Sequence, residues 1–93
     1  MRAIDRSSAF KRDFKREAKR QHRATLEDAL MRVLVALASD QPLDARHRNH
    51  DLSGDWVGYC ECHVKPDLLL IYRKSGNDTL MLARLGSHSE LFS

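Results

Sequence analysis

The sequence lacks the features that would place the protein in a membrane or outside the cell. No run among its 93 residues is apolar enough to span a bilayer. Residues 1–6 read MRAIDR and do not form the apolar stretch of a secretory signal. We therefore expect a cytoplasmic protein without membrane contact.

Cysteine is scarce, and no internal repeat or low-complexity tract is visible. Cys60 and Cys62 stand two residues apart, so on a strand they would point the same way and be too close for an easy bridge. A reducing compartment also disfavours a disulfide. A chain of 93 residues allows one modest core, and we expect a single domain over residues 1–93.

The charge is distributed unevenly along the chain. Residues 1–50 hold 12 Lys and Arg against 7 Asp and Glu, whereas residues 51–93 hold 4 against 6. The positive half suits a polyanion or an acidic protein partner equally well. The same pattern would also arise if Lys and Arg only solvated helix faces, so charge alone does not identify the partner.

The first half predicts a short strand over residues 2–6 and a helix that Ser7 or Ser8 can cap. In that helix Phe10 and Phe14 recur four residues apart, which places both on one face. Pairs of Lys and Arg fill the positions between them. We therefore expect an amphipathic helix with an apolar stripe and a basic back.

A second helix is predicted to begin at a capping box formed by Thr25 and Asp28. Its apolar residues follow helical spacing as far as Leu37, and it should end near residues 39–41, ahead of Pro42. The link between the two helices is short. This favours an antiparallel helical hairpin.

The second half changes to the period of a sheet. After a polar loop, residues 56–64, 68–74 and 79–85 predict strands separated by two tight turns. The fold class is therefore α+β, with a short N-terminal strand and a helical hairpin packed on an antiparallel sheet of three to four strands.

Alternation assigns the first of these strands two different faces. Trp56, Cys60 and Cys62 should meet the helices, whereas Glu61 and His63 should belong to the face that a substrate would reach.

Four of the five histidines lie in the second half, and imidazole exchanges protons near neutral pH. His50, His63 and His88 come from separate predicted elements, with Asp67 across a turn from His63. RNA supplies its own nucleophile, the 2′-hydroxyl, so cleavage needs a base, an acid and a cation for the developing charge. Arg84 could hold phosphate through two hydrogen bonds.

Purely structural roles and other kinds of site must be considered for the same residues. Each histidine taken singly is more often structural than catalytic, and His22 and His47 suit a surface or a phosphate contact. Zinc binding would need ligand spacings that the chain does not show, and Cys62 and His63 should point to opposite faces. Cysteine nucleophiles are disfavoured because both thiols should be buried.

Four phrases occur in order in the second half. They are NHDLSGDWVGY at residues 49–59, CHVKPD at 62–67, LLIY at 69–72 and RLGSHSELF at 84–92. Together they resemble the YafQ branch of the RelE/ParE toxin superfamily, whose first phrase reads HxLxGxWxGxR. The N-terminal helices resemble that branch in layout only.

The resemblance implies a RelE-like fold and the toxin of a type II toxin–antitoxin pair. Such toxins are ribosome-dependent endonucleases that cut mRNA in the A site without a metal or another cofactor. Carried over to this chain, the family's catalytic positions are His50, His63, Asp67 and His88. The expected substrate contacts are Arg84, Phe92, Arg48, Lys15 and Lys19.

The expected partners are a cognate antitoxin, in a hetero-oligomer, and the ribosome with its mRNA and rRNA. Two departures stand out: Leu68 replaces a Trp of a close relative, and Cys60 replaces an Arg. The alternatives are a gyrase inhibitor of the ParE type, which would need no histidine cluster, and a non-catalytic RNA- or protein-binding module.

Overall fold

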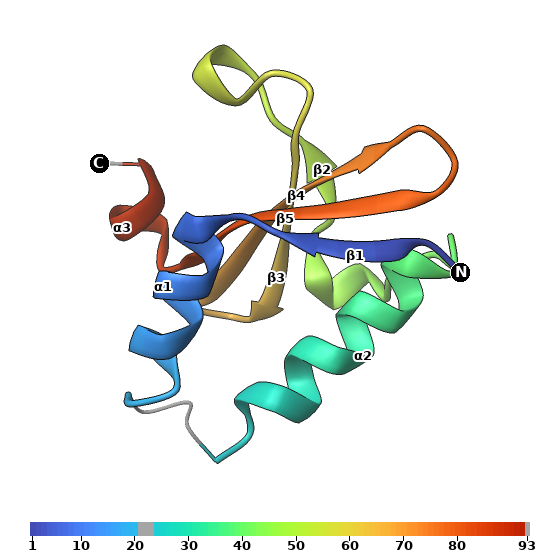
Figure 1. Cartoon of the computed structure of the whole chain (residues 1–93). Helices are drawn as coiled ribbons and strands as arrows, with labels where there is room; N and C mark the ends of the chain where they lie inside the picture. Colours follow the sequence, from blue (N-terminus) through green and yellow to red (C-terminus); the bar gives the residue numbers. More distant parts are fainter. Residues whose placement is uncertain (21–23, 93) are drawn as a thin grey trace.

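The computed structural model describes residues 1–20 and 24–92, so His22 and its predicted turn lie outside the described residues. Figure 1 shows two long helices and a sheet, with a short helix at the C-terminus. The elements in order are β1 Ala3–Arg6, α1 Ser8–Glu17, α2 Leu26–Ala38, the short 3-10 helix η1 Ala45–His47, β2 His50–Asp51, the 3-10 helix η2 Gly54–Trp56, β3 Cys60–Lys65, β4 Leu68–Ser75, β5 Thr79–Gly86 and α3 His88–Phe92.

The sheet confirms the predicted antiparallel meander and extends it on both sides. Its strand order is β1-β5-β4-β3-β2, with β1 parallel to β5 and the other neighbours antiparallel. The sheet is therefore mixed and five-stranded, not purely antiparallel with three or four strands. A parallel partner is possible because α1 and α2 lie between β1 and the meander and allow the chain to cross over.

The start of α1 follows the prediction. Ser7 is the N-cap, and its side chain accepts a hydrogen bond from the Phe10 amide at 2.9 Å. The Ser7 hydroxyl also donates to the Ala83 carbonyl of β5 at 2.7 Å. One serine thus begins the helix and attaches it to the sheet.

The predicted capping box at the start of α2 is wrong, although the helix begins where expected. Among the described residues Thr25 makes no side-chain capping bond, and its hydroxyl instead accepts a hydrogen bond from the Lys65 ammonium of β3. The helix ends at Ala38, as the sequence predicted. In Figure 1 α1 and α2 run in opposite directions and diverge at an open angle.

The main core lies between the helices and one face of the sheet. Cys62, Val64 and Leu70 are buried there with Phe10 and the apolar side of α2, as the alternation predicted. A smaller apolar cluster covers the other face. It comprises Leu69, Ile71 and Leu91, with Leu52, Trp56, Tyr59, Ala83 and Phe92 packed against them.

Trp56 was predicted on the face of the cysteines, and this prediction is wrong. Its ring packs edge-to-face on Tyr59, with centroids 5.2 Å apart, in the smaller cluster on the opposite face. Residues 54–56 form a 3-10 turn and the strand begins only at Cys60, so the period of two does not extend back to Trp56.

Where the outer strands β1 and β2 end, side chains supply hydrogen bonds to unpaired backbone groups of the next strand. β1 pairs with β5 only as far as Leu82. Beyond it, Asp13 accepts from the Leu85 amide at 3.0 Å, and Arg16 donates to the Leu85 carbonyl at 2.9 Å. At the other edge, His47 Nδ1 donates to the His63 carbonyl of β3 at 2.6 Å. These contacts replace missing strand neighbours.

Candidate active site

Strand register places three of the predicted site residues, His50, His63 and Arg84, on one face of the sheet. Across the strands, His50 pairs with Glu61, Glu61 with Ile71, and Ile71 with Arg84. Two residues along β3, His63 pairs with Leu69, which pairs with Gly86. Rows two residues apart share a face. Neighbouring strands are separated by roughly 4.8 Å, so both rows fit within one small site.

His50 is held from both sides of its ring. Its Nε2 lies 2.9 Å from Glu61 Oε2, and its Nδ1 lies 2.7 Å from the Arg48 carbonyl. A carbonyl oxygen only accepts, so Nδ1 carries a proton. The short contact to the Glu61 carboxylate therefore requires a second proton, either on Nε2 or on Glu61. The side chains of His50 and Glu61 share that second proton in their hydrogen bond.

Glu61 is the residue of this site that the sequence analysis did not assign. It was placed on the polar face, yet only 6% of the residue is exposed, and Oε1 has no hydrogen-bond partner among the described residues. Burying a carboxylate costs free energy unless the carboxylate is paired, so the burial of Glu61 against His50 indicates a functional role or a further partner. The sequence signal for Glu61 was its position two residues before His63, on the same face of β3.

His63 has one ring nitrogen, Nε2, that has no partner among the described residues. Its Nδ1 lies 3.2 Å from the Pro66 carbonyl and therefore donates its proton to that oxygen. In the neutral ring Nε2 then carries the lone pair that a general base needs. Asp67 lies exposed in the same turn between β3 and β4. The predicted contact between Asp67 and His63 stays a prediction.

A capping box orients α3 and its two rings. Glu90 Oε1 accepts from the Ser87 amide at 3.0 Å, and Ser87 Oγ accepts from the Glu90 amide at 3.3 Å. The Ser87 amide and then Arg20 stabilise the Glu90 carboxylate and lower its pKa to about 2. The rings of His88 and Phe92 lie one above the other, with centroids 4.9 Å apart.

His88 is exposed, whereas Phe92 packs against the smaller apolar cluster. Gly86 ends the second row of the sheet, and α3 begins two residues later. The structure therefore brings His88 to the end of the face that carries His50 and His63.

Arg84 is bound by an acid of α1. Its Nε donates to Asp13 Oδ2 at 2.7 Å and its Nη2 lies 3.3 Å from Oδ1. Burial would raise the pKa of Asp13, but hydrogen bonds from Arg84 and from the Leu85 amide outweigh burial and lower it. Because 28% of the Arg84 side chain stays exposed, part of the guanidinium still faces solvent. Its phosphate contact stays a prediction.

The other predicted substrate contacts are spread over the molecule. Lys15 and Lys19 are exposed on α1 and just after it, away from the two rows of the sheet. Arg48 is also exposed, and its backbone adopts the left-handed conformation, with φ of 46°. Its carbonyl holds the His50 ring, so Arg48 positions His50 whether or not its side chain contacts RNA.

The side chains of the two cysteines and of Leu68 lie away from the face that carries His50 and His63. Cys62 is buried against the helices, and desolvation raises the pKa of its thiol to about 12. Desolvation, then a hydrogen bond to Asp51, raises the pKa of Cys60 as well. Leu68 is 1% exposed in the main core and is not placed to stack on a base. The aromatic surface of the site is instead formed by Trp56, Tyr59 and Phe92.

Comparison with known proteins gives consistent matches over nearly the whole chain. Residues 2–93 match the family model described as the bacterial toxin of a type II toxin–antitoxin system, YafQ. The mRNA interferase toxin YafQ of Escherichia coli strain K12 is 35% identical over 91 residues, which are 98% of this chain and 96% of that protein.

Solved structures agree with this match. A copper-bound mutant toxin from Helicobacter pylori superposes with a TM-score of 0.86 at 36% identity, over 99% of this chain and 100% of that one. The DinJ–YafQ complex of Escherichia coli gives 0.80 at 30% identity, over 100% of both chains. In the present chain, the described residues include no group of three or more His, Cys, Asp or Glu side chains that could hold a metal ion.

Proposed function

The chain belongs to the YafQ family of type II toxins, and we propose that it is a ribosome-dependent endoribonuclease that cuts mRNA in the A site. One observation supports this most directly. Strand register gathers His50, Glu61 and His63 on one face of the sheet, and α3 brings His88 to its end. A gyrase inhibitor would need no such cluster.

The hydrogen bonds of the two sheet histidines favour different roles. His63 is the general base toward the 2′-hydroxyl, because its Nε2 has no partner among the described residues and can accept a proton. His50 is held in a fixed orientation between the Arg48 carbonyl and Glu61, and it stabilises negative charge on the phosphorane. This choice assigns the base, which the sequence left open between His50 and His63.

His88 is the general acid that protonates the departing 5′-oxygen. Attack by the 2′-oxygen on phosphorus forms one P–O bond while the bond to the 5′-oxygen breaks. This leaves a cyclic phosphate and a 5′-hydroxyl, with one proton moved to His63 and one supplied by His88. The Phe92 ring lies next to His88, tilted by 42°, and positions a base beside it. Asp67 orients a histidine or joins the proton transfer.

The test is an in vitro translation assay with toeprinting. His63→Ala and His88→Ala should each reduce A-site cleavage by about two orders of magnitude or more, because general acid–base catalysis contributes on that scale. Asp5→Ala, at an exposed position of β1, is the control. If both variants cleave as well as the wild type, the catalytic proposal is wrong. Inhibition of DNA supercoiling with intact mRNA would favour a ParE-like toxin instead.

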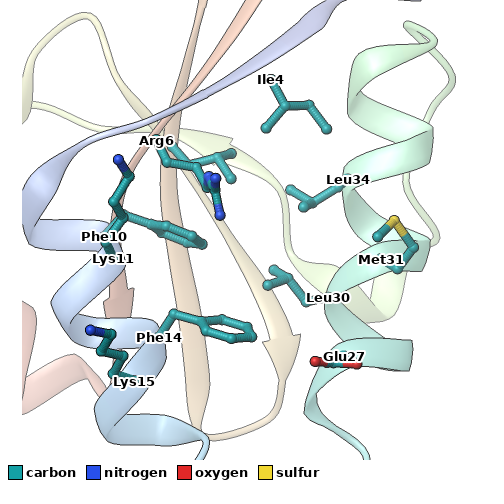
Figure 2. Close-up of a pocket in the computed structure, with 11 residues that line it drawn as sticks. Ile4, Arg6, Phe10, Lys11, Phe14, Lys15, Glu27, Leu30, Met31 and Leu34 are labelled. Carbon is teal, nitrogen blue, oxygen red and sulfur yellow. The ribbon is translucent and has the colours of Figure 1, made fainter.

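The proposed regulator is a cognate antitoxin, because the related Escherichia coli toxin YafQ forms a complex with DinJ. A groove of about 570 Å³ between α1 and α2 offers it a docking surface. Figure 2 shows the Phe10 and Phe14 rings pointing from α1 toward Leu30 and Leu34 of α2. Met31, 57% exposed, and Ile4, 40% exposed, extend the apolar lining.

The apolar lining favours an antitoxin over a nucleic acid in this groove, a choice for which the charge alone gives no reason. Arg6, Lys11 and Lys15 line the groove beside a single acid, Glu27. A nucleic acid would use these cations but could not bury the apolar side chains between them. An amphipathic helix with acidic flanks would use both. An antitoxin bound there would also cover Lys15, one of the proposed RNA contacts.

Two exposed residues of α2 give a matched pair for testing this groove. Met31→Glu should weaken binding of the neighbouring gene's antitoxin by about tenfold or more, as expected for a central apolar contact. Val35→Glu introduces the same charge one turn further along α2, outside the groove, and should bind normally. Isothermal titration calorimetry measures both. Equal binding by Met31→Glu and the wild type would exclude the groove.

A further inference from the structure

A small cavity of about 240 Å³ lies beside the site, along the edge of β3 that β2 leaves open. It is lined by residues of three elements: Arg32 of α2, Arg46 and His47 of η1, and His63 and Lys65 of β3. None of the described residues that line it is acidic. The cavity therefore gathers three permanent cations and two imidazoles around one small space.

These cations differ from the paired arginines elsewhere in the chain. Asp40 holds Arg2, Asp13 holds Arg84, and Glu90 holds Arg20. In contrast, Arg32 and Arg46 form no ion pair with another described residue, and both are exposed. Like charges that converge without an acid repel one another. Such an arrangement is stabilised when an anion enters.

His47 links the cavity to the proposed base. Its Nδ1 is committed to the His63 carbonyl at 2.6 Å, so only Nε2 is left to bind a ligand. Lys65 is held in place by the hydrogen bond that its ammonium donates to Thr25. Two members of the lining, His47 and Lys65, are thus fixed by protein contacts before any ligand arrives, which lowers the entropic cost of binding.

We infer that this cavity is a second phosphate-binding site, which takes a backbone phosphodiester of the mRNA next to the scissile bond. Arg32 and Arg46 hold the phosphate oxygens through charge-assisted hydrogen bonds, and His47 donates from Nε2 when protonated. The identity of the strand as mRNA rests on the proposed function, whereas the affinity for phosphate does not. The cavity borders His63, so the bound phosphate fixes the register of the strand at the proposed base.

The first experiment titrates the whole protein with inorganic phosphate and follows it by NMR. The amides of Arg46, His47 and Lys65 and the His47 ring should shift and saturate. Arg32→Ala and Arg46→Ala should lose these shifts. Lys74→Ala removes the same charge at the far end of β4 and should retain them. Shifts that are spread over the surface, or that persist in both variants, would overturn the inference.

The second experiment measures binding of a short single-stranded RNA whose 2′-hydroxyls are methylated to prevent cleavage. Arg46→Ala should lower the affinity several-fold and make the slope of log K against log salt shallower by about 0.7, the contribution of one phosphate contact on a single strand. An unchanged slope would count against the site. Because Lys74 lies at the far end of β4, Lys74→Ala again serves as the charge control.

The two proposals fail in distinguishable ways. If the protein never cleaves mRNA but phosphate still saturates the cavity, the proposed function is wrong and the phosphate site stands. If His88→Ala abolishes cleavage while Arg32→Ala and Arg46→Ala behave as the wild type in both experiments, the function stands and the site is wrong. Far-UV circular dichroism of the two variants checks folding, which should be intact because both arginines are exposed.

Discussion

At the scale of single residues, the contact between His50 and Glu61 is the most informative feature of the site. The imidazole is fixed by a backbone carbonyl on one side and a buried carboxylate on the other. A histidine held in this way keeps its orientation. His63, whose Nε2 has no partner among the described residues, is suited to a different task. Two similar side chains thus differ in role because their partners differ.

We predict that Glu61→Gln lowers A-site cleavage by about tenfold to a hundredfold, because the carboxylate that holds the His50 ring at Nε2 is lost. Glu27→Gln is a control, since it removes an exposed carboxylate on α2. Cleavage by Glu61→Gln at the rate of the wild type, with normal folding, would contradict the proposed pairing.

At the scale of elements, α3 depends on its capping box. The helix has five residues, too few to be stable by itself, and it carries both His88 and Phe92. Glu90 caps its N-terminus and also binds Arg20 beyond the end of α1. The position of one catalytic candidate therefore depends on a carboxylate that takes no part in the chemistry.

We predict that Glu90→Gln destabilises the protein by about 1 kcal/mol at pH 7, because the amide oxygen can still cap the helix but the charge that pairs with Arg16 and Arg20 is lost. The pKa of Glu90 is lowered from 4.5 to about 2, so its contribution is complete above pH 4.5 and disappears as the pH falls toward 2. Urea unfolding of both proteins between pH 7 and 2.5 should therefore show a difference that shrinks on acidification. A difference that does not depend on pH would refute the electrostatic origin.

At the scale of the whole molecule, one buried carboxylate joins the helical layer to the sheet. Asp13 of α1 is 3% exposed and contacts Arg84, Arg16 and the Leu85 amide. Arg16 continues the network to Glu17 and Glu90, so α1, β5 and α3 share one set of ion pairs. Removal of one buried member leaves the others without their partner.

We predict that Asp13→Asn costs about 3 kcal/mol of unfolding free energy, as expected when a buried ion pair is broken on one side. Cleavage should fall as well, because the Arg84 side chain loses its anchor. Asp5→Asn, at an exposed position of β1, should change the stability little. Urea denaturation measures both variants, and equal midpoints would show that the network contributes nothing.

The sequence by itself determined the elements and much of their orientation. Periodicity placed the two long helices and the meander, Ser7 began a helix as predicted, and alternation buried Cys62. These features depend on neighbours within about four residues, so local sequence contains their cause. The ordered phrases of the second half also indicated the family, which the comparisons confirmed.

Only the tertiary structure decided which groups meet across long separations. In the folded chain Glu61 contacts His50, and Arg84 binds an acid 71 residues away. Lys65 donates a hydrogen bond to Thr25, and β1 pairs in parallel with β5. Such contacts depend on how whole elements pack and on the free energy of closing long loops, and no spacing in the sequence encodes them. For the same reason, the sequence could name His50 and His63 but not assign their partners.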